Sequence, residues 1–99
     1  MVTMDGSSLR FDPSGELSIY QVEEARKQIL GSFAQAKEIL IDLTRNDKID
    51  TAGFQLLLSL IKSCKTFGKT WTIEGMGGSA ENFMALFGYE WDAPHKGEV

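Results

Sequence analysis

The sequence predicts a single α/β domain with a mixed β-sheet of about four strands and helices packed on it, in the order β-β-α-β-α-β-α. Two observations predict this class. Segments with the apolar pattern of strands are interleaved with segments whose apolar residues recur at helical spacing. Strands that alternate with helices imply crossover connections and helices that lie on a sheet. A length of 99 residues fits one domain, 1–99, with a core at about 8–88 and a C-terminal tail at 89–99.

The first third of the chain predicts a hairpin followed by a helix. Residues 8–11 and 16–19 alternate between polar and apolar side chains, and Asp12-Pro13-Ser14-Gly15 between them has the composition of a turn. From Tyr20 the apolar spacing becomes helical. The inward positions of this helix are Val22, Ala25, Ile29 and Phe33.

The next segments predict two strands separated by a helix. Residues 38–43 form a nearly continuous apolar run, which is typical of a central strand. A polar loop at 44–48 leads to a helix that ends near Gly68, and its inward positions are Phe54, Leu57, Leu58, Ile61 and Cys64. Residues 69–74 alternate with Trp71 and Ile73 on one face, which indicates a further strand with a buried Trp71.

The last segment predicts a turn and a short helix. Glycines between Gly75 and Gly78 turn the chain, Ser79 can cap a helix that carries Phe83, Leu86 and Phe87, and Gly88 ends it. The stretch Gly75–Ala80 also matches the dinucleotide-binding pattern G-x-G-x-x-A. That fingerprint needs a second strand and an acidic residue further on, and neither follows. We therefore interpret it as a turn with a serine cap.

Composition excludes several classes of function. Ten Lys and Arg against fourteen Asp and Glu give a net charge of −4, and no basic run exceeds Arg26-Lys27. A protein that binds a nucleic-acid duplex needs a basic patch, so we expect no nucleic-acid partner. The single cysteine, Cys64, excludes a disulfide framework and fits a buried apolar side chain in a reducing compartment. Residues 1–10 lack the pattern of a signal peptide and no apolar run approaches membrane-spanning length, so we expect a cytoplasmic protein without membrane insertion.

The residues that catalysis or metal binding would need are missing. The only histidine, His95, lies in the tail, so no nucleophile–base set is indicated. Asp42, Asp47 and Asp50 are close in sequence but lack the spacing of a calcium loop, and we expect Asp42 and Asp47 to bound a solvated loop. The sequence therefore predicts no enzyme activity, no cofactor and no metal.

The segment Ile49-Asp50-Thr51-Ala52-Gly53 is the strongest candidate for a site, since it joins a strand to a helix. Asp50 or Thr51 can supply the oxygen that caps the helix. The small Ala52-Gly53 pair leaves the first turn sparsely covered for an approaching molecule, and a helix N-terminus is a favourable place for a phosphoryl group. The residues alone leave two interpretations open: a helix cap, or a site of docking or modification.

These segments resemble the STAS domain, the fold of bacterial anti-sigma factor antagonists and of sulphate-transporter regulatory domains. Gly15-Glu16-Leu17 before a helix is similar to the opening signature of the family. Ile41-Asp42-Leu43-Thr44, followed by Asp50-Thr51-Ala52-Gly53 and a Leu-rich helix, is similar to its most specific part. The resemblance covers about residues 9–87.

The resemblance implies a site at the start of the second helix. In antagonists of this family a partner kinase, which is also the anti-sigma factor, phosphorylates the Ser or Thr after the Asp, and a phosphatase restores the partner-binding form. The phosphorylation site implied here is Thr51. The implied partner-binding residues are Ser18, Asp50, Thr51, Ala52, Gly53 and Phe54. Two positions depart from sporulation-type antagonists: Ser18 replaces an Asp that faces the acceptor loop, and Ala52 replaces a Ser or Thr.

The implied function is a non-catalytic protein-interaction switch in bacterial signalling. Its partner would be an anti-sigma-type serine kinase, a phosphatase or a related signalling protein. The Asp-Thr-Ala-Gly-Phe form also resembles stand-alone STAS proteins of chemotaxis-type signalling and the cytoplasmic STAS subunit of phospholipid-transport ABC complexes, whose partner is an ATPase. A third alternative, a small-ligand or nucleotide-binding STAS module, rests on analogy of fold and on the Gly75 motif.

Overall fold

A tight turn at Gly6 and Ser7 joins the first two strands, β1 (Val2–Asp5) and β2 (Ser8–Phe11), in the computed structural model, which describes residues 1–75. The strands pair antiparallel from Val2 opposite Phe11 to Asp5 opposite Ser8. Gly6 has a φ of 64°, a conformation that glycine adopts without strain. The hairpin predicted between 8–11 and 16–19 is therefore wrong, and the sheet begins at Val2 rather than near residue 8.

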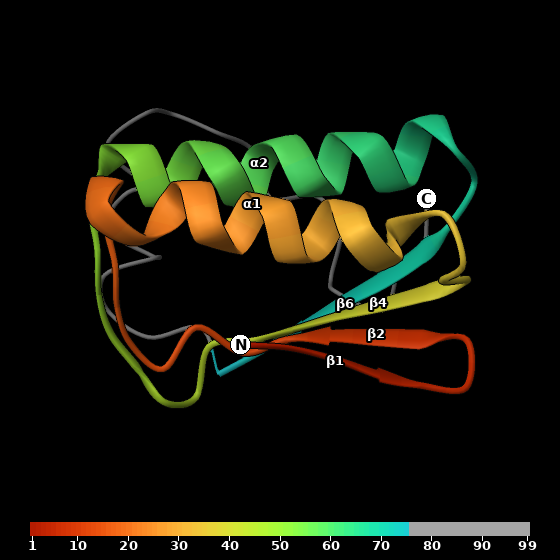
Figure 1. Ribbon diagram of the computed structural model, residues 1–99, viewed down its shortest axis with the longest axis horizontal. Coiled ribbons are helices and arrows are strands. Elements are labelled where there is room, and N and C mark those ends of the chain that lie inside the picture. Colours follow the sequence, from red (N-terminus) through yellow and green to blue (C-terminus); the bar gives the residue numbers. More distant parts are fainter. Residues whose placement is uncertain (76–99) are drawn as a thin grey trace.

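Two parallel strands complete the main sheet. β4 (Glu38–Asp42) pairs with β2, and β6 (Thr70–Glu74) pairs with β4, which gives the order β1-β2-β4-β6 (Figure 1). Alternate residues of these strands point into the core, and Trp71 is 1% exposed, as its alternation with Ile73 predicts. The buried apolar side chains of β2, β4 and β6 are Leu9, Phe11, Ile39, Ile41, Trp71 and Ile73.

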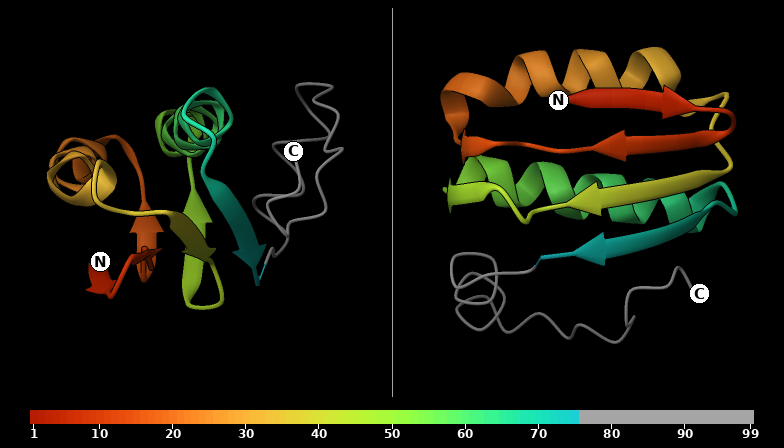
Figure 2. Two further views of the ribbon diagram at one scale, coloured as in Figure 1. Left: turned by 90° about the vertical axis from the view of Figure 1, so that its right-hand side faces the viewer. Right: turned by 90° about the horizontal axis from the view of Figure 1, so that it is seen from below.

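Both helices lie side by side on one face of the sheet (Figure 2). α1 spans Ile19–Phe33 and buries Ala25 and Ile29, whereas α2 spans Thr51–Thr66 and buries a longer apolar stripe. That stripe includes Leu57, Leu60, Ile61 and Cys64. Cys64 is fully buried, as the sequence predicts, and this desolvation raises the pKa of its thiol to about 11. The predicted α/β class is confirmed.

A second, two-stranded sheet lies under the N-termini of the helices. β3 (Gly15–Leu17) runs parallel to β5 (Asn46–Ile49), and Leu17 lies opposite Ile49. The loop expected at 44–48 is in part a strand, because the Asn46 side chain donates hydrogen bonds to the carbonyls of Pro13 and Gly15 and fixes β5 against β3. The pair thus connects two segments that are about thirty residues apart.

Several predictions concern residues beyond 75. The turn after Gly75, the helix from Ser79, His95 and the tail at 89–99 lie outside the described residues. Within residues 1–75, neither helix is long and apolar enough to cross a membrane.

Candidate functional site

The N-termini of the two helices are placed next to each other by the β3–β5 pair. Each strand leads directly into a helix: β3 ends at Leu17 before α1, and β5 ends at Ile49 before α2. Because the strands are parallel and Leu17 lies opposite Ile49, both helices start at the same end of the small sheet, where the two strands finish. The predicted site residues from both segments are therefore close in space.

Ser18 caps α1. Its Oγ accepts a hydrogen bond from the backbone N–H of Tyr20 at 3.3 Å, and the Gln21 side chain accepts one from the Ser18 N–H at 2.9 Å. This is a capping box, and Ser-x-x-Gln in the sequence is its signature. The Ser18 side chain is only 3% exposed, so its role in the site is to fix the direction of α1. It also makes Ile19 the first helical residue rather than the end of a strand.

Asp50 caps α2 and at the same time contacts the first residue of α1. Its Oδ1 accepts the N–H of Gly53 at 2.9 Å, and its Oδ2 accepts the N–H of Ile19 at 3.0 Å. Hydrogen bonds from backbone N–H groups, that of Gly53 above all, lower the pKa of the Asp50 carboxyl below its ordinary value. The carboxylate therefore couples the two helix starts, which resolves the choice of cap between Asp50 and Thr51.

Thr51 is the first residue of α2 and its side chain is exposed. Its hydroxyl makes no hydrogen bond with any group in residues 1–75. It stands at the positive end of the helix dipole, where negative charge is tolerated. The fold thus leaves this hydroxyl unused.

The next three residues turn progressively inward. Ala52 is half-buried, whereas Gly53 and Phe54 are buried. A Cβ on Gly53 would lie 2.2 Å from the carbonyl oxygen of Leu17. The expectation that Ala52-Gly53 opens the helix backbone to another molecule is therefore wrong for Gly53, because its missing side chain makes room for β3. Of the six predicted binding residues, Asp50, Thr51 and Ala52 have accessible surface, and the other three lie beneath it.

Two exposed residues beside the site were not among the predicted ones. Ile19 is 65% exposed and Tyr20 is 86% exposed, and both lie on the first turn of α1, where the N–H of Ile19 donates to Asp50. The sequence carries a signal for them, since they precede the buried positions Ala25 and Ile29 and are out of phase with them. They add an apolar surface to the helix starts.

Asp42 belongs to a separate, structural network. It is 3% exposed, its Oδ1 accepts the N–H and the hydroxyl of Thr44 at 3.0 and 2.6 Å, and its Oδ2 is paired with Arg10. The hydrogen bonds from Thr44, followed by the charge of Arg10, lower the pKa of this carboxyl. The expectation that Asp42 borders a solvated loop is therefore wrong, whereas Asp47 is exposed. In the described part of the chain, no group of three His, Cys, Asp or Glu residues is placed to hold a metal ion.

Comparison with known proteins matches this arrangement to one family. The model of the STAS domain matches residues 2–91, and no curated protein matches the sequence. The fold is similar to the anti-sigma factor antagonist SpoIIAA in its unphosphorylated form, with a TM-score of 0.76 and 16% identity over 100% of this chain and 87% of that one.

Two further solved structures share the fold. A Thermotoga maritima protein assigned as an anti-sigma factor antagonist has a TM-score of 0.80 and 14% identity over 95% of this chain and 82% of its own. A sulfate transporter family protein from Wolinella succinogenes has a TM-score of 0.68 and 17% identity over 88% and 71% of the two chains. At these identities the likeness is one of fold. The match of the family model over residues 2–91 shows that the chain belongs to the STAS domain family.

Proposed function

We propose that the chain is a non-catalytic protein-interaction switch of bacterial signalling, which acts in the cytoplasm and docks a protein partner through the start of α2. The observation that carries this proposal is that the described part of the fold does not use the Thr51 hydroxyl. Its side chain is exposed at a helix N-terminus, and its hydroxyl makes no hydrogen bond within residues 1–75, because Asp50 provides the cap. A hydroxyl that the fold does not use is available to a partner or to a kinase.

The docking surface consists of the accessible parts of Asp50, Thr51 and Ala52 together with Ile19 and Tyr20. The exposed apolar side chains of Ile19 and Tyr20 supply the area that a partner buries. Ser18, Gly53 and Phe54 support this surface from beneath. The partner that fits the family resemblance is an anti-sigma-type serine kinase or a related signalling protein. The shared fold of the two antagonist structures supports this choice.

Phosphorylation of Thr51 is the proposed regulation. A phosphate adds about −1.5 to −2 charges, and the helix N-terminus tolerates these within the domain. In a buried interface the same charges, beside the carboxylate of Asp50, repel the partner's acidic groups and resist desolvation. The modified domain therefore keeps its fold and releases its partner.

A capture experiment tests the proposal. Immobilised wild-type protein and the Thr51→Glu variant are exposed to a lysate of the source cells, and bound proteins are identified by mass spectrometry. The control is Thr3→Glu, which adds the same charge at an exposed position of β1. We expect a signalling kinase or phosphatase with wild type and with the control, and its loss with Thr51→Glu. Capture of an ABC ATPase instead would favour the transporter-subunit alternative.

A further inference from the structure

The outer surface of α1 carries a stripe of six residues whose chemistry is complementary about its midpoint. The six residues line a single surface hollow, and all of them belong to α1. They are Ile19, Val22, Glu23, Arg26, Lys27 and Leu30. Apolar residues stand at the two ends, and charged residues of opposite sign stand on either side of the centre, which lies between residues 24 and 25.

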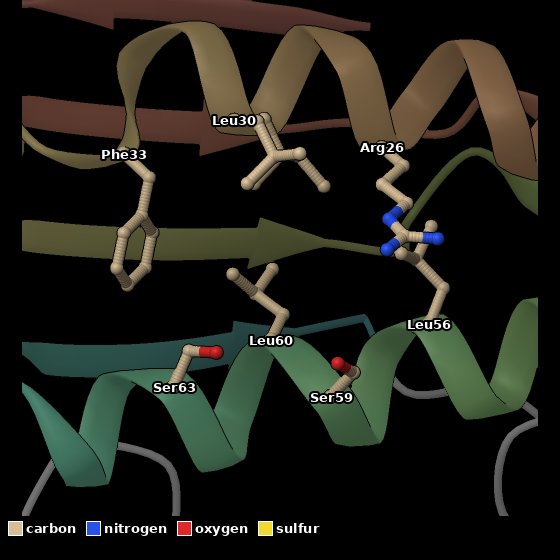
Figure 3. A pocket seen from close by; sticks show the side chains of 8 residues that line it. Arg26, Leu30, Phe33, Leu56, Ser59, Leu60 and Ser63 are labelled. Atoms are coloured by element: carbon tan, nitrogen blue, oxygen red, sulfur yellow. The ribbon is translucent and has the colours of Figure 1, made fainter.

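The ends of the stripe are not used by the fold. Ile19 is 65% exposed and Leu30 is 66% exposed, so neither side chain is buried in the core. Figure 3 looks onto the helices with the strands behind them, and the side chains of Arg26 and Leu30 lie over the groove between α1 and α2. The stripe and the groove are therefore continuous.

The charges of the stripe are also unused. Glu23 could pair with Arg26 or Lys27 of its own helix, since residues three and four apart are neighbours. Within residues 1–75, however, the ion pairs are those of Arg10 with Asp42 and of Arg45 with Asp12, and none involves the stripe. The opposite charges of α1 thus remain available to another molecule.

We propose that this stripe is the interface of a symmetric dimer, in which α1 packs antiparallel against α1 of a second copy. A two-fold axis through the midpoint of the stripe brings Glu23 of each copy next to Arg26 of the other. The same axis places Ile19 next to Leu30, and Val22 next to the aliphatic part of Lys27. Each residue of the stripe then contacts a complementary residue of the other copy, and the two-fold axis repeats each of these contacts.

The dimer is expected to be weak and to depend on concentration. α1 has 15 residues and is about 22 Å long, so a single helix pair buries less surface than a stable dimer requires. Thr51 lies on α2 outside the stripe. Ile19 belongs both to the stripe and to the proposed docking surface, but no residue of α2 belongs to the stripe, so the test of the dimer needs no partner.

Charge reversal tests the symmetric pairing directly. Sedimentation velocity of the full chain, from about 10 µM to about 1 mM, measures whether the mass rises from 11.0 kDa towards that of two chains. Glu23→Arg places Arg against Arg across the axis, and Arg26→Glu places Glu against Glu. We expect each variant alone to dimerise about tenfold more weakly than wild type. An equimolar mixture of the two variants restores both opposite-charge pairs, so it should regain the wild-type mass.

Glu24→Arg is the matched control, because it makes the same charge change at an exposed residue of α1 outside the stripe. It should dimerise like wild type. The proposal is overturned if wild type stays at one chain's mass throughout, if the single variants dimerise as tightly as wild type, or if the mixture fails to regain the dimer. Recovery in the mixture also shows that both variants are folded.

Discussion

The carboxylate of Asp50 accepts the backbone N–H of Ile19 at 3.0 Å, although the two residues are 31 positions apart and begin different helices. Its other oxygen accepts the N–H of Gly53 within α2. One side chain thus satisfies an unpaired donor at the start of each helix. The position of α1 relative to Thr51 depends on this carboxylate.

Replacement of Asp50 by Asn should therefore lower stability in a way that depends on pH. Folding lowers the pKa of Asp50 below its ordinary value of 3.8, so its stabilising contribution is fully present above that value and is lost as the pH falls through the folded pKa. The melting temperature of wild type should exceed that of Asp50→Asn at pH 7. The gap should narrow below about pH 4. A gap that stays constant into the acid range would contradict this role of the charge.

Gly53 should be the position of the site that tolerates substitution least. A Cβ there would lie 2.2 Å from the Leu17 carbonyl oxygen, and backbone must move to relieve the overlap. Gly53→Ala should cost about 3 kcal/mol of unfolding free energy, measured by urea denaturation. Gly31 is the control, because it lies in α1 with nothing within 4 Å of the added Cβ. Gly31→Ala should stabilise the protein by up to about 1 kcal/mol, and equal effects at both glycines would contradict the packing argument.

Removal of the Asp42 carboxylate should cost more stability than removal of its partner Arg10. Asp42→Ala removes a buried acceptor and leaves the Thr44 N–H without its partner, which should cost about 2 kcal/mol. The Arg10 side chain is 47% exposed, so Arg10→Ala should cost about 0.5 kcal/mol. Chemical denaturation of both variants measures which of them loses more unfolding free energy. A larger loss for Arg10→Ala would show that the ion pair, and not the hydrogen bonds, dominates.

Cys64 should be almost unreactive in the folded protein. The thiol is fully buried and its pKa is raised to about 11, so little thiolate exists at neutral pH and reagents reach it only when the protein opens. Labelling with a thiol reagent at pH 7.5 should be at least about a hundredfold slower than in 6 M guanidinium chloride. A Thr66→Cys variant with Cys64→Ala provides an exposed thiol on the same helix and should label at once. Rapid labelling of native Cys64 would contradict its placement.

Much of the fold could be predicted from the sequence. The apolar spacing of α1 and α2, the run at β4 and the alternation at β6 each depend on local pattern, and their positions are confirmed. The β1–β2 hairpin is not predicted, because residues 16–17 alternate like a strand and the sequence pattern pairs them with residues 8–11. In the structure residues 16–17 belong to β3, which pairs with β5 instead. Gly6-Ser7, the two-residue loop between β1 and β2, is the sequence signal that could have placed this hairpin.

The site could be predicted only in part. The STAS resemblance identifies the segment around Thr51, and Asp-Thr at a strand-to-helix junction indicates a cap. The link from Asp50 to Ile19 could not be predicted, since it depends on how β3 and β5 bring two distant segments together. The role of Gly53 likewise depends on the Leu17 carbonyl, which no local pattern reveals.

The central claim is that Thr51 is a docking residue rather than a structural one. Because Asp50 caps α2 and the Thr51 hydroxyl makes no hydrogen bond within residues 1–75, Thr51→Ala and Thr51→Glu should both unfold within about 0.5 kcal/mol of wild type. Isothermal titration calorimetry with the captured partner is the most direct measurement. Thr51→Ala should bind nearly as tightly as wild type, whereas Thr51→Glu should lose about 2–5 kcal/mol of binding free energy, because it buries an unpaired charge beside Asp50. Wild-type affinity for Thr51→Glu would contradict the account.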